Sequence, residues 1–314
     1  MIDMSSSALS EVSTASQTGA VTARTTTAPA GSISFVFTIL HDAADVLPLL
    51  NVLEKVRRPD DEVIVLIREG RPQTYTQPPE WVRIVAVPDV SIFRQRTYIP
   101  VLCSKEWVVL LEDHIMVEPA AFEAIRALIR EQPDLDIIPF IAKNLTSVGT
   151  WDWAIFMFTF ALVWGPLDHS PPFSAVTSSI VRRASLGPEL RDGEWELRVI
   201  PRIFQTGKRA YSNAIFMDHI KPKTFWGAVT NIFLNARSGA ELQLALGNPK
   251  RDILWEGWYT FWHRPGELMR ALAARRHELP AGTQLRLHVL GFTHLTGFIV
   301  CLLFGGGRAA YLLD

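Results

Sequence analysis

The stretch from residue 32 to residue 141 alternates short apolar runs with amphipathic segments, and this alternation restricts the possible folds more than any other feature. Five runs rich in β-branched and aromatic residues predict buried strands, at 32–40, 61–67, 82–87, 107–111 and 136–141. Apolar residues at helical spacing predict helices at 42–56 and 119–132, and 92–105 is weakly helical. Strands that alternate with helices form βαβ units. We therefore predict an α/β fold with a mostly parallel central sheet and helices on both faces.

A cluster of polar side chains ends the fourth of these runs. Glu112, Asp113 and His114 follow the apolar run directly, and Pro119 comes shortly after them. In one interpretation the strand simply ends there and the three side chains are solvated. Ligands of such sheets, however, bind beyond the carboxyl ends of the strands. Because buried charge is costly unless it is paired or coordinates a metal, we favour a functional site.

Charge, cysteine and glycine patterns exclude several classes of protein. The chain has 31 Lys and Arg against 32 Asp and Glu, which argues against a nucleic-acid partner held by bulk electrostatics. Its two cysteines, Cys103 and Cys301, lie in apolar runs far apart and form no disulfide framework. No glycine-rich phosphate cradle of the dinucleotide or P-loop type is present. A divalent cation is the other common means of neutralising a diphosphate.

With these features, residues 32–239 resemble an inverting GT-A glycosyltransferase of family two. In that family the fourth strand ends on a D-x-D motif, and Glu112 and His114 stand at its two acidic positions. Arg96 and Thr97 match an Arg-Asn pair on the preceding helix, with threonine replacing asparagine. The resemblance implies a nucleotide-sugar donor that is bound with Mn²⁺ or Mg²⁺.

The resemblance also implies which residues form the donor and metal sites. His114 would be a metal ligand, since neutral imidazole and carboxylates both bind Mn²⁺-like ions. His219 matches a later histidine of the family that can complete the metal shell, although a lone histidine after an apolar run is more often packed or capped. The donor would contact Arg96, Glu112, Asp113, and His41 and Glu69 after the first two strands.

A second motif, GEWELRVIPRIFQTG at 193–207, carries the candidate catalytic base. An inverting transfer needs a carboxylate that deprotonates the acceptor hydroxyl. Alignment on the family pattern places Glu196 at the position of this base, with Glu194 as a close competitor. The same resemblance places Arg202 and Trp195 on the acceptor side. The alternative is an ordinary amphipathic helix with solvated charges.

The C-terminal third gathers the aromatic and apolar residues. Segment 252–272 interleaves tryptophan with basic residues, as at a membrane interface. Leu287–Phe304 is uncharged and approaches the length of a membrane span, yet contains polar residues. An interfacial or re-entrant helix is favoured, and a short transmembrane helix or a buried helix remains an alternative. Gly291 and Gly297 would allow close helix packing.

Together these observations predict a disordered tail at 1–31, a GT-A domain at 32–240 and a membrane-associated helical region at 241–314. The predicted enzyme transfers a hexose, with inversion, to a glycan or lipid-linked acceptor in polysaccharide biosynthesis. It would work at the cytoplasmic face of the membrane, without a nucleic-acid partner. Two alternatives stay open: a nucleotidyltransferase on the same sheet, and a non-catalytic GT-A-like membrane scaffold.

Overall fold

The computed structural model describes residues 31–39, 43–70, 78–88, 90–145, 149–171, 179–187, 194–219 and 223–312. The N-terminal segment that the sequence predicts to be disordered falls, up to residue 30, outside these ranges. The same holds for His41.

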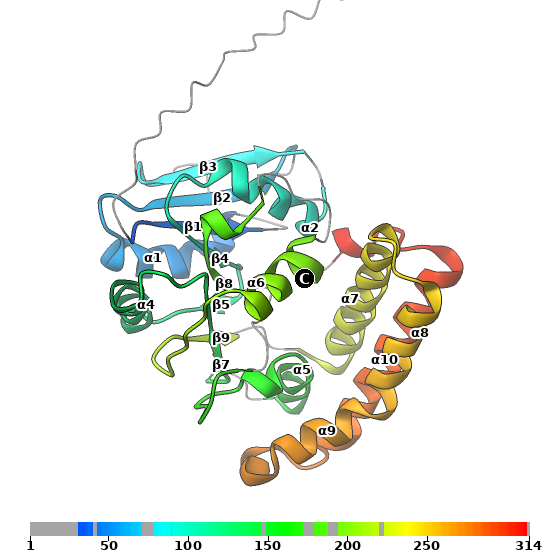
Figure 1. Ribbon diagram of the computed structural model, residues 1–314. Helices are drawn as coiled ribbons and strands as arrows, with labels where there is room; N and C mark the ends of the chain where they lie inside the picture. Colours follow the sequence, from blue (N-terminus) through cyan, green and yellow to red (C-terminus); the bar gives the residue numbers. More distant parts are fainter. Residues whose placement is uncertain are drawn as a thin grey trace, which may run out of the picture.

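A six-stranded sheet forms the centre of the molecule (Figure 1). In spatial order its strands are β3 (Val82–Val87), β2 (Glu62–Arg68), β1 (Ile33–Thr38), β4 (Trp107–Leu111), β8 (Ser179–Arg182) and β6 (Ile137–Pro139). The first four run parallel, and β8 is antiparallel to both of its neighbours. The predicted mostly parallel sheet is confirmed.

Helices cover both faces of this sheet, which explains why its central strands are apolar throughout. Successive side chains of β1 point to opposite faces. Phe35 packs in the core formed with α1 (Leu47–Val56) and α4 (Pro119–Glu131), where its ring meets that of Phe122 edge-on at 5.4 Å. Val36 belongs to a second core cluster on the other face, together with residues of α6, Ile200–Thr206.

A smaller sheet lies beside the first and begins where two of the main strands end. Its order is β5 (Ile115–Met116), β9 (Phe216–His219), β7 (Ile141–Lys143). The run at 136–141, predicted as one strand, is therefore divided: β6 ends at Pro139, and β7 begins in the other sheet. Proline cannot donate to a sheet ladder, so it commonly stands where pairing changes. The polar residues that follow β4 likewise form the turn between the two sheets.

Five longer helices complete the fold: α5 (Thr150–Phe160), α7 (Phe225–Ala245), α8 (Lys250–Trp262), α9 (Arg264–Ala271) and α10 (Thr283–Phe304). In Figure 1, α8, α9 and α10 lie on the side of the molecule away from the main sheet. Helix α7 continues through residue 240, where the sequence places a domain boundary. Within the described residues, α10 is the one helix long and apolar enough to cross a membrane, and 44% of its most apolar window is buried.

Two glycines let α10 pack closely against its neighbours. A Cβ atom on Gly297 would lie 2.7 Å from the carbonyl oxygen of Phe233 and 2.8 Å from the Cβ of Ala236, both in α7. A Cβ atom on Gly291 would lie 2.9 Å from the carbonyl oxygen of Thr260 in α8. The close packing predicted for both glycines is confirmed.

This packing gives a first testable expectation. Gly297→Ala should lower the free energy of unfolding by about 1–3 kcal/mol, because the new methyl group would overlap the backbone of α7. Gly239→Ala is the matched control, since a Cβ there meets no heavy atom within 4 Å. In the control, the free energy of unfolding should rise by up to about 1 kcal/mol, because alanine has a better helix propensity than glycine. Urea denaturation measures both, and equal effects of the two substitutions would contradict the packing argument.

Candidate functional site

The three polar residues after β4 occupy a turn that is fixed at both ends. β4 ends at Leu111 and β5 begins at Ile115, so Glu112, Asp113 and His114 join the two sheets. In the smaller sheet Ile115 pairs with His219 of β9. Because β1, β2 and β4 are parallel, the turn lies at the edge where all three strands end. This edge is where ligands of α/β sheets bind.

Arg96 reaches the same edge from a chain of short helical turns. It begins a 3₁₀ turn between α2 (Ile92–Gln95) and α3 (Ile99–Leu102), in the segment predicted to be weakly helical. The preceding residue, Gln95, donates from Nε2 to the carbonyl oxygen of Ile39, just beyond β1, at 3.0 Å. Arg96 itself is 1% exposed. A buried cation of this kind requires anionic partners.

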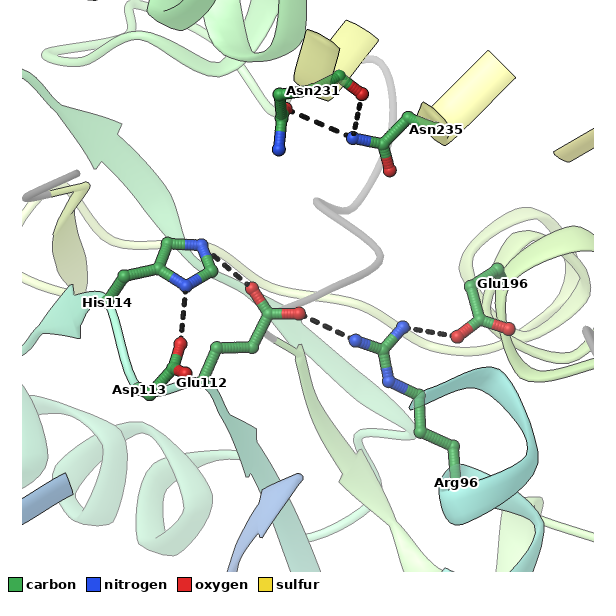
Figure 2. A network of polar contacts seen from close by, with 7 residues as sticks. All are labelled: Arg96, Glu112, Asp113, His114, Glu196, Asn231 and Asn235. Atoms are coloured by element: carbon green, nitrogen blue, oxygen red, sulfur yellow. Dashed lines mark hydrogen bonds and ion pairs between the residues drawn. The ribbon is translucent and has the colours of Figure 1, made fainter. Parts of the chain in front are cut away.

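Two carboxylates supply those partners (Figure 2). Arg96 donates from Nη2 to Oε1 of Glu112 at 2.6 Å and from Nη1 to Oε1 of Glu196. Burial alone would lower the pKa of Arg96, but the two carboxylates raise it above its ordinary value, so the guanidinium is charged. Burial raises the pKa of Glu196, and Arg96 opposes that rise. A carboxylate with a raised pKa is a better proton acceptor near neutral pH.

The polar chain continues from Glu112 into the histidine. Oε2 of Glu112 lies 3.3 Å from Nε2 of His114, and Nδ1 of His114 lies 2.7 Å from Oδ1 of Asp113. Figure 2 shows the resulting row of side chains, Asp113, His114, Glu112, Arg96 and Glu196. Five residues predicted for donor, metal and base are thus brought together, although Arg96 and Glu196 are 100 positions apart.

The two candidate bases have different surroundings in the structure. Glu196 lies in a π-helical turn, Trp195–Val199, in which the Ile200 N–H donates to the carbonyl oxygen of Trp195. Such wide turns occur frequently at functional sites. Glu194 lies next to the turn, with its Oε1 3.9 Å from Nη1 of Arg198. A helical segment is therefore present, as the alternative interpretation requires, but Glu196 is paired inside the protein rather than solvated.

Other predicted residues are placed differently. Trp195 is 1% exposed and packs in the core cluster that contains Val36, and its predicted place on the acceptor side stays a prediction. Its large apolar ring fills the space under the sheet. Arg202 is exposed and donates to the carbonyl oxygen of Ser185 at 3.4 Å. Glu69 is exposed directly after β2. The side chain of His219 is outside the described part of the structure.

Three polar atoms around Arg96 are buried without a hydrogen-bond partner within the described residues. They are Oε1 of Gln95, Nε of Arg96 and Oε2 of Glu196. Buried unpaired groups are rare in folded proteins, and each calls for an explanation. A polar ligand or water at this position would satisfy them. Sequence reasoning did not single out Gln95, because one glutamine in a short helix carries no pattern.

Figure 2 also labels two asparagines of α7, Asn231 and Asn235, which form a separate pair and which the sequence did not single out. Asn235 donates from Nδ2 to the carbonyl oxygen of Asn231 at 3.0 Å and to its Oδ1 at 3.1 Å. Their spacing of four residues places both on one face of the helix. That spacing of two amides in an apolar helix was the available signal.

Glu112 and His114 supply two of the ligands that a divalent cation would need. Oε2 of Glu112 and Nε2 of His114 are close enough to share one ion, and carboxylate and imidazole are both ligands of Mn²⁺-like metals. Among the side chains that the structure describes, no group of three or more His, Cys, Asp or Glu is placed to hold a metal. The remaining ligands would have to come from a bound molecule or from residues outside the described ranges.

Comparison with known proteins places the fold. No protein-family model matches the chain, and no curated protein matches its sequence. A solved mannosyltransferase, PcManGT from Pyrobaculum calidifontis in complex with GDP-Man and Mn²⁺, aligns over 87% of both chains with a TM-score of 0.51 and 10% identity. The chain has a GT-A fold. S. aureus TarS 1–349 aligns over 85% of this chain and 89% of that chain, with a TM-score of 0.42 and 12% identity.

Proposed function

We propose that this GT-A protein is a glycosyltransferase of the family-two type. It would move a hexose, with inversion, from a nucleotide-sugar donor to a glycan or lipid-linked acceptor. One observation carries the proposal: Arg96 joins Glu112, at the donor end of the sheet, to the candidate base Glu196. The solved neighbour that holds GDP-Man and Mn²⁺ supports the class of donor.

At the donor end, Glu112 and His114 would hold the divalent cation, and His219 would be a further ligand from the adjacent strand. The bound ion would stabilise the charge of the departing diphosphate. Oδ1 of Asp113 would accept a hydrogen bond from Nδ1–H of His114 and so orient the ring with Nε2 toward Glu112. His41 and Glu69, after the first two strands, would contact the nucleoside, and Arg202 would stay on the acceptor side.

At the acceptor end, Glu196 would remove the proton from the attacking hydroxyl. In the structure one oxygen of Glu196 is held by Arg96, and the other has no hydrogen-bond partner among the described residues. A diphosphate carries more negative charge than either carboxylate, so a bound donor would attract Arg96. Donor binding would thereby loosen the Arg96–Glu196 pair and leave the base free for the acceptor. One guanidinium would couple the two ends of the site.

A panel of nucleotide sugars tests the proposed activity. Binding of GDP- and UDP-sugars is measured by calorimetry with Mn²⁺, with Mg²⁺ and with a chelator, and donor hydrolysis is followed in parallel. We expect metal-dependent binding of one donor class and release of a nucleoside diphosphate. Pyrophosphate released from a nucleoside triphosphate would instead indicate a nucleotidyltransferase. Absence of metal-dependent binding to any donor would indicate the non-catalytic scaffold.

The metal assignment has its own test. His114→Ala should weaken Mn²⁺ binding, measured by calorimetry or electron paramagnetic resonance in the presence of nucleotide, by at least about tenfold, because removing even a supporting residue costs that much. His114→Asp should retain most of the affinity, since a carboxylate is also a suitable ligand. His277→Ala, at an exposed histidine in the C-terminal region, is the control. Unchanged Mn²⁺ affinity in His114→Ala would exclude the assignment.

A further inference from the structure

Large apolar side chains are exposed along one side of α8 and α10. We call them the aromatic strip: Leu254, Trp255, Trp258, Tyr259, Trp262, Leu285, Phe292, Ile299, Leu303 and Phe304. Ring contacts make the strip continuous across the two helices. The ring centroids of Trp258 and Trp262 are 5.9 Å apart. The ring centroid of Phe261 lies 4.8 Å from that of Trp262 and 5.7 Å from that of Phe292 in α10. Contiguous exposed apolar surface of this kind marks an interaction site.

Helix α10 has two sides with different surroundings. Leu285, Phe292 and Ile299 are seven residues apart and so lie along one exposed side. Its other side carries Gly291 and Gly297, which touch the backbones of α8 and α7. A helix that crossed a bilayer alone would have to leave these contacts. The close packing therefore favours a helix that stays attached to the protein and offers only its exposed side to a partner.

Two threonines of α10 have hydrogen-bond partners within the helix, whereas Nδ1 of His294 is buried without a partner among the described residues. Thr296, beside the strip, donates its hydroxyl to the carbonyl oxygen of Phe292 at 2.9 Å. The hydroxyl of Thr293 likewise donates to the carbonyl oxygen of Val289 at 2.9 Å. His294 packs between Phe158 and Phe298, where burial lowers its pKa to about 4 and keeps the ring neutral. These threonines need no water as a partner, which suits an apolar environment.

Positive charge accompanies the strip. Segment 250–286 contains seven Lys and Arg but four Asp and Glu, in a chain whose formal charge is −1. Lys250 and Arg251 are exposed at the start of α8, and Arg270 and Arg276 are exposed beyond its other end. Tryptophan and basic side chains are the residues that seat at the headgroup level of anionic membranes.

We infer that the aromatic strip docks onto an anionic lipid bilayer, with α8 and α10 lying along one leaflet and neither helix crossing it. This inference gives the mode of membrane attachment, and it does not require that the chain transfer sugars. Gly297 of α10 packs against Ala236 of α7, so α7 supports the helix that carries part of the strip.

Vesicle flotation tests the inference with the full-length chain and no donor or acceptor. The vesicles contain phosphatidylcholine alone or mixed with phosphatidylglycerol. We expect detergent-free binding to the mixed vesicles, weaker binding to the neutral ones, and exchange of bound protein onto fresh vesicles. Leu303→Gln and Phe292→Gln should each lower the partition coefficient about tenfold, because each withdraws a large side chain from the apolar layer.

Leu145→Gln is the matched control, since Leu145 is 62% exposed and Leu303 is 69% exposed, but Leu145 lies outside the strip. Its binding should equal that of the parent chain. Absence of vesicle binding, or an equal loss in the control, would overturn the inference. Protein that never exchanges and needs detergent for release would show that α10 spans the bilayer. A dimer in ultracentrifugation that the strip substitutions abolish, without vesicle binding, would show that a second copy covers the strip.

Discussion

Glu196→Gln is expected to reduce glycosyl transfer about 10²- to 10⁴-fold, the usual cost of removing a general base. Glutamine keeps the size of the side chain and an oxygen that can accept from Arg96, so the local structure should persist. It cannot take the acceptor proton. Donor affinity, measured by calorimetry, should therefore change little while the turnover number falls. The separation of binding from turnover is what distinguishes a base from a residue that only supports the fold.

Glu194→Gln provides the matched control for this experiment. Glu194 is two positions away and lies beside Arg198 rather than Arg96. Its replacement should leave transfer within a few fold of the parent chain. If Glu194→Gln were the inactive variant, the base would be Glu194. If neither substitution affected transfer, the motif would be a structural helix, and the proposed role of Glu196 would be wrong.

Arg96→Ala is expected to lower the free energy of unfolding by about 3–5 kcal/mol, the typical cost of removing one partner of a buried ion pair. Arg96 is nearly inaccessible to solvent, and its removal would leave Glu112 and Glu196 without a cation between them. Urea denaturation measures the loss. Replacing Arg96 with Met together with Glu112→Gln and Glu196→Gln should recover much of it, because the uncompensated charges are gone.

A second buried arginine separates stability from function. Arg126 pairs with Asp61 below the other face of the sheet, and both side chains are nearly inaccessible to solvent. Arg126→Ala should also lower the free energy of unfolding, yet leave donor affinity in the folded protein unchanged. Arg96→Ala should weaken donor binding as well. If both variants bound the donor equally well, Arg96 would be a structural residue and the proposed coupling of donor and base would fail.

Much of the fold follows from local patterns in the sequence. A strand forms within each of the apolar runs at 32–40, 61–67, 82–87 and 107–111, because burial on both faces of a parallel sheet requires continuous apolar residues. The same patterns place Glu112 at the carboxyl end of β4. The glycines of α10 pack closely, as their small size predicts. The run at 136–141 is the exception, since local pattern does not say which sheet each half joins.

The sequence by itself determined which residues stand at strand ends and which helix faces are apolar, since both depend on periods of two and 3.6 residues along the chain. Tertiary structure alone decided the pairing of Arg96 with Glu196 across 100 positions, the burial of Trp195, and the two-sided character of α10. These features depend on how distant segments pack against one another. Glu194 and Glu196 look alike in the sequence, and a π-helical turn beside a buried tryptophan selects the one that meets the arginine.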